Sequence, residues 1–264
     1  MNALTGWQIE EIAPALGAVV RGIDMGGELD DDQWEAIDAL FAAHLVLVFP
    51  HQKLTPKRHV EIGEHFGDPY IHPFLTAIPD HPAILEVLKE PEDEAPFGGE
   101  HWHCDISFTD PAASVSLLYG IEIPPSGGDT LFANTALAYS QLSPGMKGFL
   151  EGLNAHHTYP GKSEQEHGAS ALHPVVRIHP VTGLKSLYVN TAFVHRFEDM
   201  TERESAPLIE FLCEHQTRPD YQTRIPWEPD QLVIWDNRAT VHYALNDYPG
   251  VRRNLHRVTV LERV

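Results

Sequence analysis

The order of apolar and polar positions along the chain predicts short strands with a small number of helices inserted among them. Near the N-terminus, 18–24 and Leu45–Phe49 are short apolar runs typical of strands, and apolar side chains recur at helical spacing from Asp31 to Ala43. A second helix is expected to begin at Thr55-Pro56, a typical N-cap followed by a first-turn proline, and to end at Gly67. This part of the chain therefore predicts a β-α-β unit followed by a helix.

The later part of the chain is richer in strand patterns, which are separated by proline and glycine turns. Two helical inserts interrupt them: one runs from Asn134 to Glu151 and is broken at Ser143-Pro144, and one begins at Thr201 with a capping box to Glu204. Residues 161–171 carry small polar side chains without periodicity and predict a surface loop or lid. The expected strands are Ser114–Ile121, Thr130–Ala133, Val175–His179, Leu187–Asn190, Leu232–Trp235 and Arg253–Leu261.

Short strands in this number are typical of a sandwich or a barrel. No internal repeat, low-complexity tract or linker divides the sequence, so one domain over residues 1–264 is expected. The predicted fold class is α+β, mainly β.

The composition of the chain mainly excludes certain classes of binding partner. Because 18 Lys+Arg stand against 38 Asp+Glu, the formal net charge is −20, and such a surface repels nucleic acids and anionic membranes. The N-terminal sequence has neither a basic nor an apolar leader region, and no later apolar run has the length of a membrane span. Two cysteines are consistent with a reducing compartment. We expect a cytoplasmic protein, with homo-oligomerisation left open.

The sharpest local signal is the segment from His101 to Asp105, in a chain of 17 histidines. On a strand, side chains two residues apart share a face, so His103 and Asp105 can point at one metal while Cys104 points away. His101 could share that face. The best donor of a third ligand is His242, which follows a buried-looking strand and a turn. Two histidines and one carboxylate leave coordination positions open, as in non-haem Fe(II) oxygenases rather than closed zinc sites.

The alternative is that the histidine–aspartate pair is a coincidence, since a pattern this short recurs by chance. Longer sequence segments decide between a metal site and a coincidence, because these segments follow one another in the order found in one protein family. They are FGDPYIHP (66–73), WHCDISF (102–108), GGDTLFANT (127–135), HPVVRIHPVTG (173–183), LYVN (187–190), WDNRATVHYALNDY (235–248) and RRNLHRVT (252–259). Together they resemble the taurine dioxygenase/2,4-D dioxygenase (TauD/TfdA) family.

The resemblance implies a fold, cofactors and a reaction. The fold is a double-stranded β-helix, a jelly-roll core with flanking helices. The protein would use Fe(II), 2-oxoglutarate as cosubstrate and O2, hydroxylating a small anionic organic substrate and forming succinate and CO2. By resemblance, iron is assigned to His103, Asp105 and His242, and the distal carboxylate of 2-oxoglutarate to Thr130 and Arg253.

Residue chemistry supports the cosubstrate assignment independently. A buried dicarboxylate needs a paired charge, and a guanidinium matches a carboxylate with two parallel hydrogen bonds. Arg253 and Arg257 lie four residues apart on the last expected strand and so face the same way. Two inward arginines imply two buried anions, of which the second would be the substrate, as the resemblance also implies for Arg257. The alternative for Arg257 is a structural salt bridge to a core carboxylate.

Further substrate contacts are implied by the resemblance alone. His72 matches a histidine that contacts substrate in the taurine enzyme, and Phe193 matches an aromatic wall, although each could instead be a packing residue. Leu75 and Gly99 stand where the taurine enzyme has a tyrosine and an asparagine, which argues against taurine itself. Sulfonates, sulfate esters and carboxylates all remain as substrate classes.

Other residues have structural interpretations. His156-His157, His173 and His179 have no carboxylate at ligand spacing, and residues 235–237 are interpreted as scaffold beneath His242, with orientation of the ligands as the alternative. A different function is also conceivable: a cupin-type binding protein or a non-redox metal hydrolase that uses His101, His103 and a downstream glutamate. Ser107 and Phe108 occupy the stretch where that glutamate is needed.

Overall fold

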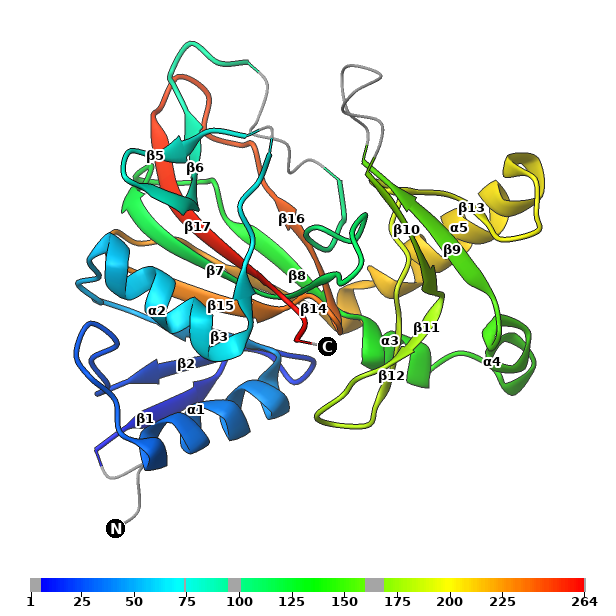
Figure 1. The fold of residues 1–264 in the computed structure, drawn as a ribbon, viewed down its shortest axis with the longest axis horizontal. Helices are drawn as coiled ribbons and strands as arrows, with labels where there is room; N and C mark the ends of the chain where they lie inside the picture. Colours follow the sequence, from blue (N-terminus) through cyan, green and yellow to red (C-terminus); the bar gives the residue numbers. More distant parts are fainter. Residues whose placement is uncertain (1–5, 74, 95–100, 160–168, 264) are drawn as a thin grey trace.

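A computed structural model of the chain describes residues 6–73, 75–94, 101–159 and 169–263. The core consists of a large sheet and a smaller antiparallel sheet, with helices outside them (Figure 1). This arrangement confirms the prediction of a mainly β fold with flanking helices. No helix in the described ranges is both long and apolar enough to cross a membrane.

The large sheet has the strand order β1-β2-β3-β15-β7-β17-β6-β5, and β4 pairs with β17. Neighbouring strands are antiparallel, apart from the parallel pair β2 and β3. Their bounds are β1 Gln8–Glu11, β2 Ala18–Arg21, β3 Val46–Phe49, β4 Asp68–Pro69, β5 Ala77–Ile78, β6 His81–Lys89, β7 Ala113–Glu122, β15 Leu232–Asp236 and β17 Arg253–Leu261.

The smaller sheet has the order β14-β8-β16 and comprises Gln222–Ile225, Thr130–Asn134 and Thr240–Ala244, respectively. Phe132 of β8, Trp235 of β15 and Leu255 of β17 are buried in one cluster, so the two sheets pack against each other through apolar side chains. His242, one of the candidate metal ligands, lies beside this cluster, with its ring 5.8 Å from that of Phe132 and 5.0 Å from that of Trp235.

Two helices cover the outer face of the large sheet, α1 (Asp31–His44) and α2 (Pro56–Phe66) (Figure 1). Both were predicted closely. The Asp30 side chain caps α1 within a capping box, the Thr55 side chain accepts a hydrogen bond from the Arg58 N–H of α2, and Gly67 ends α2. These caps stabilise helix ends whose N–H groups have no partner within the helix.

The remaining elements form the lobe at the right of Figure 1. Its helices confirm the two expected inserts, including the break at Ser143-Pro144 and the capping box of Thr201. The elements are α3 Thr135–Ser140, α4 Pro144–Leu150, β9 Asn154–Thr158, β10 Ser170–Pro174, β11 Val176–Ile178, β12 Lys185–Leu187, β13 Val194–Phe197, α5 Glu202–Gln216 and the 3-10 turn η1 Pro219–Tyr221.

Two sequence predictions in this lobe need correction. The strand expected over Leu187–Asn190 ends at Leu187, because the Asn190 side chain accepts hydrogen bonds from the N–H groups of Ala192 and Phe193 and builds a turn. Residues 161–168 of the loop expected over 161–171 lie outside the described residues. Ser170 and Ala171, which were expected to belong to the loop, are part of β10 and pair with β9.

Candidate active site

His103 and His242 are brought together by the backbone. His103 forms an antiparallel bridge with His242 of β16, in which each N–H donates to the other residue's carbonyl at 3.0 and 2.7 Å. A turn begins at Asp105, so the expectation that the whole histidine–aspartate segment lies on a strand is wrong beyond this bridge. Cys104 nevertheless points elsewhere, into a buried cluster with Ala112 and Tyr188.

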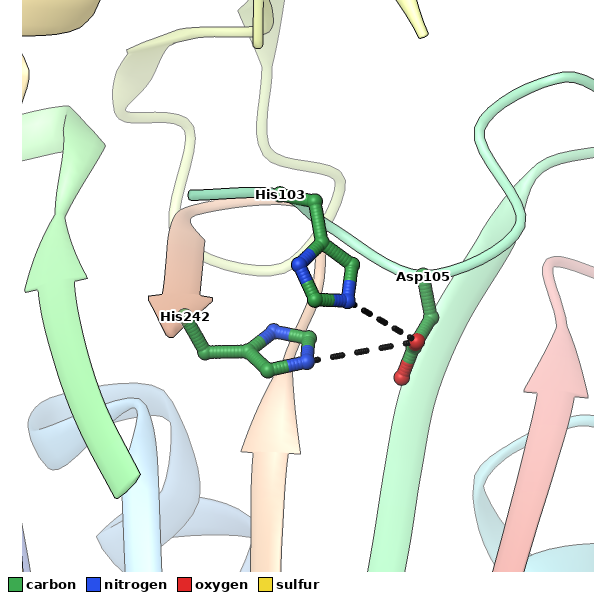
Figure 2. A group of neighbouring side chains, drawn as sticks. All are labelled: His103, Asp105 and His242. Carbon is green, nitrogen blue, oxygen red and sulfur yellow. Dashed lines mark ion pairs between the residues drawn. The ribbon is translucent and has the colours of Figure 1, made fainter. Parts of the chain in front are cut away.

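The side chains of His103, Asp105 and His242 converge, as Figure 2 shows. Asp105 Oδ1 lies 3.8 Å from His103 Nε2 and 4.0 Å from His242 Nε2. The three potential ligand atoms lie within 4.8 Å of one another, and all three residues are buried. Donor atoms this close, from two imidazoles and one carboxylate, can hold one divalent transition metal.

The protonation states also suit a metal. The Nδ1–H of His103 donates to the His101 carbonyl at 2.7 Å, which leaves Nε2 with its lone pair directed at the site. Burial lowers the pKa of both histidines, more than the neighbouring Asp105 raises it. Burial raises the pKa of Asp105, but Arg257 and the two histidines oppose it and the pKa falls to about 2. At neutral pH the set therefore comprises two neutral imidazoles and a carboxylate.

Arg253 and Thr130 both lie next to Trp227. The Trp227 indole N–H donates to Thr130 Oγ1 at 3.0 Å, and the Arg253 guanidinium lies 5.9 Å from the centre of the Trp227 ring. Arg253 Nη2 donates to the Gly128 carbonyl at 2.9 Å, while its buried Nε has no hydrogen-bond partner among the described residues. An unpaired donor on a buried guanidinium fits a carboxylate ligand at this position.

Arg257 and His72 line one cavity, together with Leu75. Arg257 Nη1 donates to Asp105 Oδ1 at 2.9 Å, so it does form the salt bridge considered as its alternative role, with a candidate metal ligand as the partner. Burial and the nearby Arg257 charge lower the pKa of His72 to about 4. The Phe193 ring lies 6.2 Å from the ring of His103, so all three expected substrate residues lie around the candidate ligands.

Comparison with known proteins identifies the family. A model described as "Taurine catabolism dioxygenase TauD, TfdA family" matches residues 8–259 of the chain. The chain belongs to the TauD/TfdA family.

Individual relatives agree with this assignment. An alkylsulfatase of Acinetobacter baylyi is 34% identical, over 97% of this chain and 86% of that protein. An alpha-ketoglutarate-dependent sulfate ester dioxygenase of Pseudomonas putida is 31% identical, over 97% of this chain and 90% of that protein. The crystal structure of a taurine dioxygenase from Burkholderia xenovorans superposes with a TM-score of 0.87 at 34% identity, covering 98% of this chain and 90% of that one.

This TauD/TfdA member is accordingly an Fe(II)- and 2-oxoglutarate-dependent dioxygenase that uses O2, with the expected jelly-roll fold. The cupin-type and hydrolase alternatives are thereby set aside. Three of the histidines that were not assigned to the metal have structural partners: His179 pairs with Asp236 at 2.8 Å, His157 hydrogen-bonds to Ser107 at 2.9 Å and His173 to the Thr109 carbonyl at 3.0 Å. His101 is exposed and does not join the ligand group, and Gly99 lies outside the described residues.

Sequence reasoning did not identify Ser116 of β7, whose hydroxyl donates to Asp105 Oδ2 at 2.7 Å. The available signal was a pair of serines, Ser114 and Ser116, on one face of an otherwise apolar strand. Asn237, considered earlier as scaffold or orienting residue, accepts a hydrogen bond from the Asp105 N–H at 3.0 Å. This contact supports the alternative that Asn237 orients the candidate ligand Asp105.

Proposed function

We propose that this enzyme hydroxylates a small organic anion and that His103, Asp105 and His242 hold its Fe(II). The support is the convergence of three buried donor atoms, with His103 fixed through its Nδ1–H and Asp105 ionised. Fe(II), when bound with 2-oxoglutarate and O2, supplies an oxidation in which 2-oxoglutarate becomes succinate and CO2 while one oxygen atom enters a C–H bond. The chain's own residues bind, orient and exclude water.

The distal carboxylate of 2-oxoglutarate is assigned to Arg253 and Thr130. Arg253 is 5% exposed, and its Nε has no hydrogen-bond partner in the part of the chain that the structure describes. Thr130 is left with a hydroxyl proton to donate because its oxygen accepts from Trp227. A guanidinium and a hydroxyl that are both next to one indole can donate to a single carboxylate.

The substrate anion is assigned to Arg257, with His72 and Phe193 beside it. The observation that carries this assignment is the position of Arg257, which contacts Asp105 and also lines a cavity. The other walls of that cavity are largely apolar, and none of the described residues lining it is acidic. Such a cavity favours a sulfate ester, sulfonate or carboxylate with an apolar body over taurine, whose ammonium group would lack a carboxylate partner.

Coupled turnover with a panel of anions tests this proposal. Succinate formation is measured with alkyl sulfates, alkanesulfonates, alkyl carboxylates and taurine, for the wild type and for Arg257→Gln. We expect at least one apolar-tailed anion to stimulate turnover more than taurine, and the variant to need a much higher concentration of it. The matched control is Arg263→Gln, an exposed arginine paired with Asp68. Unaltered affinity for that anion in Arg257→Gln would refute the assignment.

A further inference from the structure

The Asp105 carboxylate is held by a buried hydrogen-bond network anchored on two strands of the large sheet. Ser116 of β7 donates to Asp105 Oδ2 at 2.7 Å, and the Asn237 amide donates to Ser116 Oγ at 2.9 Å. The Asn237 carbonyl oxygen accepts from the Asp105 N–H at 3.0 Å and from the Trp235 indole N–H at 3.1 Å. Each of these side chains is 3% exposed or less.

The direction of each hydrogen bond follows from the available protons. The Asn237 amide nitrogen can only donate, so Ser116 Oγ accepts from it. An ionised carboxylate can only accept, so the single Ser116 proton goes to Asp105 Oδ2. Thr259 Oγ1, at 3.3 Å, then acts as a donor to Ser116 Oγ. Every polar atom at the centre of the network is satisfied in one arrangement, which is the condition for a buried polar network to be rigid.

The network leaves the two carboxylate oxygens in different environments. Oδ2 points at Ser116, whereas Oδ1 faces the Nε2 atoms of His103 and His242 and the Arg257 guanidinium. Because Asp105 begins a turn, no strand pairing fixes its backbone, and Asn237 takes over that role through the Asp105 N–H.

We propose that Ser116 and Asn237 are positioning residues that present Asp105 to the metal through Oδ1 alone. The inference rests on the proposed function, because it takes Asp105 to be an Fe(II) ligand. Ser116 and Trp235 are directly paired in the register of β7 and β15, so the residues that hold the carboxylate are anchored on neighbouring strands of the large sheet. Hydrogen-bond partners of ligating carboxylates typically change metal affinity or activity by about ten- to a hundredfold when removed.

Metal binding by the full-length protein tests the proposal without relying on turnover. Mn(II) and Co(II) affinities are measured for the wild type, Ser116→Ala, Asn237→Ala and Asp105→Ala. The matched control is Ser114→Ala: Ser114 lies on the same strand face, is equally buried and donates to the Val260 carbonyl at 3.2 Å instead of to a ligand. Thermal unfolding of the metal-free variants separates lost stability from lost affinity.

We expect Ser116→Ala and Asn237→Ala to lower metal affinity about ten- to a hundredfold and to shift the visible spectrum of bound Co(II). Ser114→Ala should lose similar stability while keeping wild-type affinity and spectrum, and Ser116→Thr, which retains the hydroxyl, should restore most of the affinity. If Ser116→Ala does not fold, Ser116→Cys replaces it, since a thiol keeps the volume but is a weaker donor.

The outcomes distinguish this inference from the proposed function. Wild-type affinity and an unshifted Co(II) spectrum in Ser116→Ala, or in its cysteine replacement, would overturn the positioning role. Wild-type affinity in Asp105→Ala would instead overturn the ligand assignment on which it rests. Equal losses of metal affinity in Ser114→Ala and Ser116→Ala would show a merely structural effect and also overturn the inference.

Discussion

Two arginines of β17 face the barrel interior four residues apart and have different partners. Arg253 donates to a backbone carbonyl and lies close to the rings of Trp227 and Tyr248, whereas Arg257 pairs with the carboxylate of Asp105. Arg252 points the other way and forms exposed ion pairs with Glu90 and Glu122. These three arginines, close together in the sequence, thus differ in burial, and we expect them to differ in function.

Arg253→Gln is expected to weaken 2-oxoglutarate binding strongly and to leave Fe(II) binding nearly intact. Removing one partner of a buried, hydrogen-bonded charge pair costs about 2–5 kcal/mol, which is roughly thirtyfold to several thousandfold in affinity. The dissociation constant of 2-oxoglutarate, measured anaerobically on the Fe(II) protein, checks this. Arg252→Gln, at the residue just before β17, is the control, and equal cosubstrate affinity in Arg253→Gln and the wild type would disprove the role of Arg253.

At the residue scale, sequence spacing predicted which side chains converge but not what holds them. His103 and Asp105 converge as their spacing predicted, although Asp105 begins a turn instead of continuing a strand, and Arg257 of β17 contacts Asp105. Ser116 could not be assigned in this way. Ser116 lies on β7, whereas Asp105 lies in a turn outside that strand. Their contact depends on how the chain folds in three dimensions, which the local residue pattern does not indicate.

Among the elements, the turn before β8 directly contacts Arg253, to which the cosubstrate carboxylate is proposed to bind. Gly127 and Gly128 both have positive φ, at 80° and 73°. The Gly128 carbonyl accepts from Arg253, and a Cβ on Gly128 would lie 3.0 Å from Arg253 Nε. Glycine is therefore required here both by backbone conformation and by the close approach of the guanidinium.

Gly128→Ala is expected to weaken 2-oxoglutarate binding as well as stability. A non-glycine residue in this conformation costs about 1–2 kcal/mol, and the added methyl group displaces Arg253 from its carbonyl partner. The matched control is Gly183→Ala, because Gly183 has φ of 70° and nothing within 4 Å of an added Cβ. Cosubstrate affinity and unfolding free energy should both fall in Gly128→Ala, but only the latter in Gly183→Ala. A loss of cosubstrate affinity shared by both variants would contradict this reasoning.

Elements with clear hydrophobic periodicity or capping residues were predicted well, as α1, α2, α5 and β17 show. Strands β9 and β10 were not predicted, since histidines and small polar residues interrupt any apolar alternation. Their burial depends on partners elsewhere in the chain: His157 bonds to Ser107, and His173 bonds to the Thr109 carbonyl. These partners are distant in the sequence, so the local residue pattern of β9 and β10 does not predict them.

Across the whole molecule, folding buries several histidines in their neutral form. Burial, reinforced by the nearby His256, lowers the pKa of His59 to about 3, and burial with His173 lowers that of His157 to about 3. An unfolded histidine titrates near pH 6.5. Between pH 6.5 and about 3 the unfolded chain therefore binds more protons at these two positions than the folded chain does.

The free energy of unfolding is consequently expected to be highest above pH 6.5 and to fall as the pH drops through this window. Each such histidine contributes a slope of about 1.4 kcal/mol per pH unit, or roughly 2 kcal/mol between pH 6.5 and 5. Denaturant unfolding at a series of pH values measures it. His59→Gln should reduce the slope by one histidine's share. An unchanged slope in His59→Gln would disprove the neutral burial of His59.

The central claim is that one Fe(II) is held by His103, Asp105 and His242 and that 2-oxoglutarate binds to it with the help of Arg253. One anaerobic titration tests this claim most directly. Fe(II) and then 2-oxoglutarate are added to the full-length protein, and the visible charge-transfer band of the complex is recorded. The account predicts a band that saturates at about one Fe(II) per chain in the wild type and is lost in His242→Ala. A wild-type band in His242→Ala, or no band in the wild type, would contradict it.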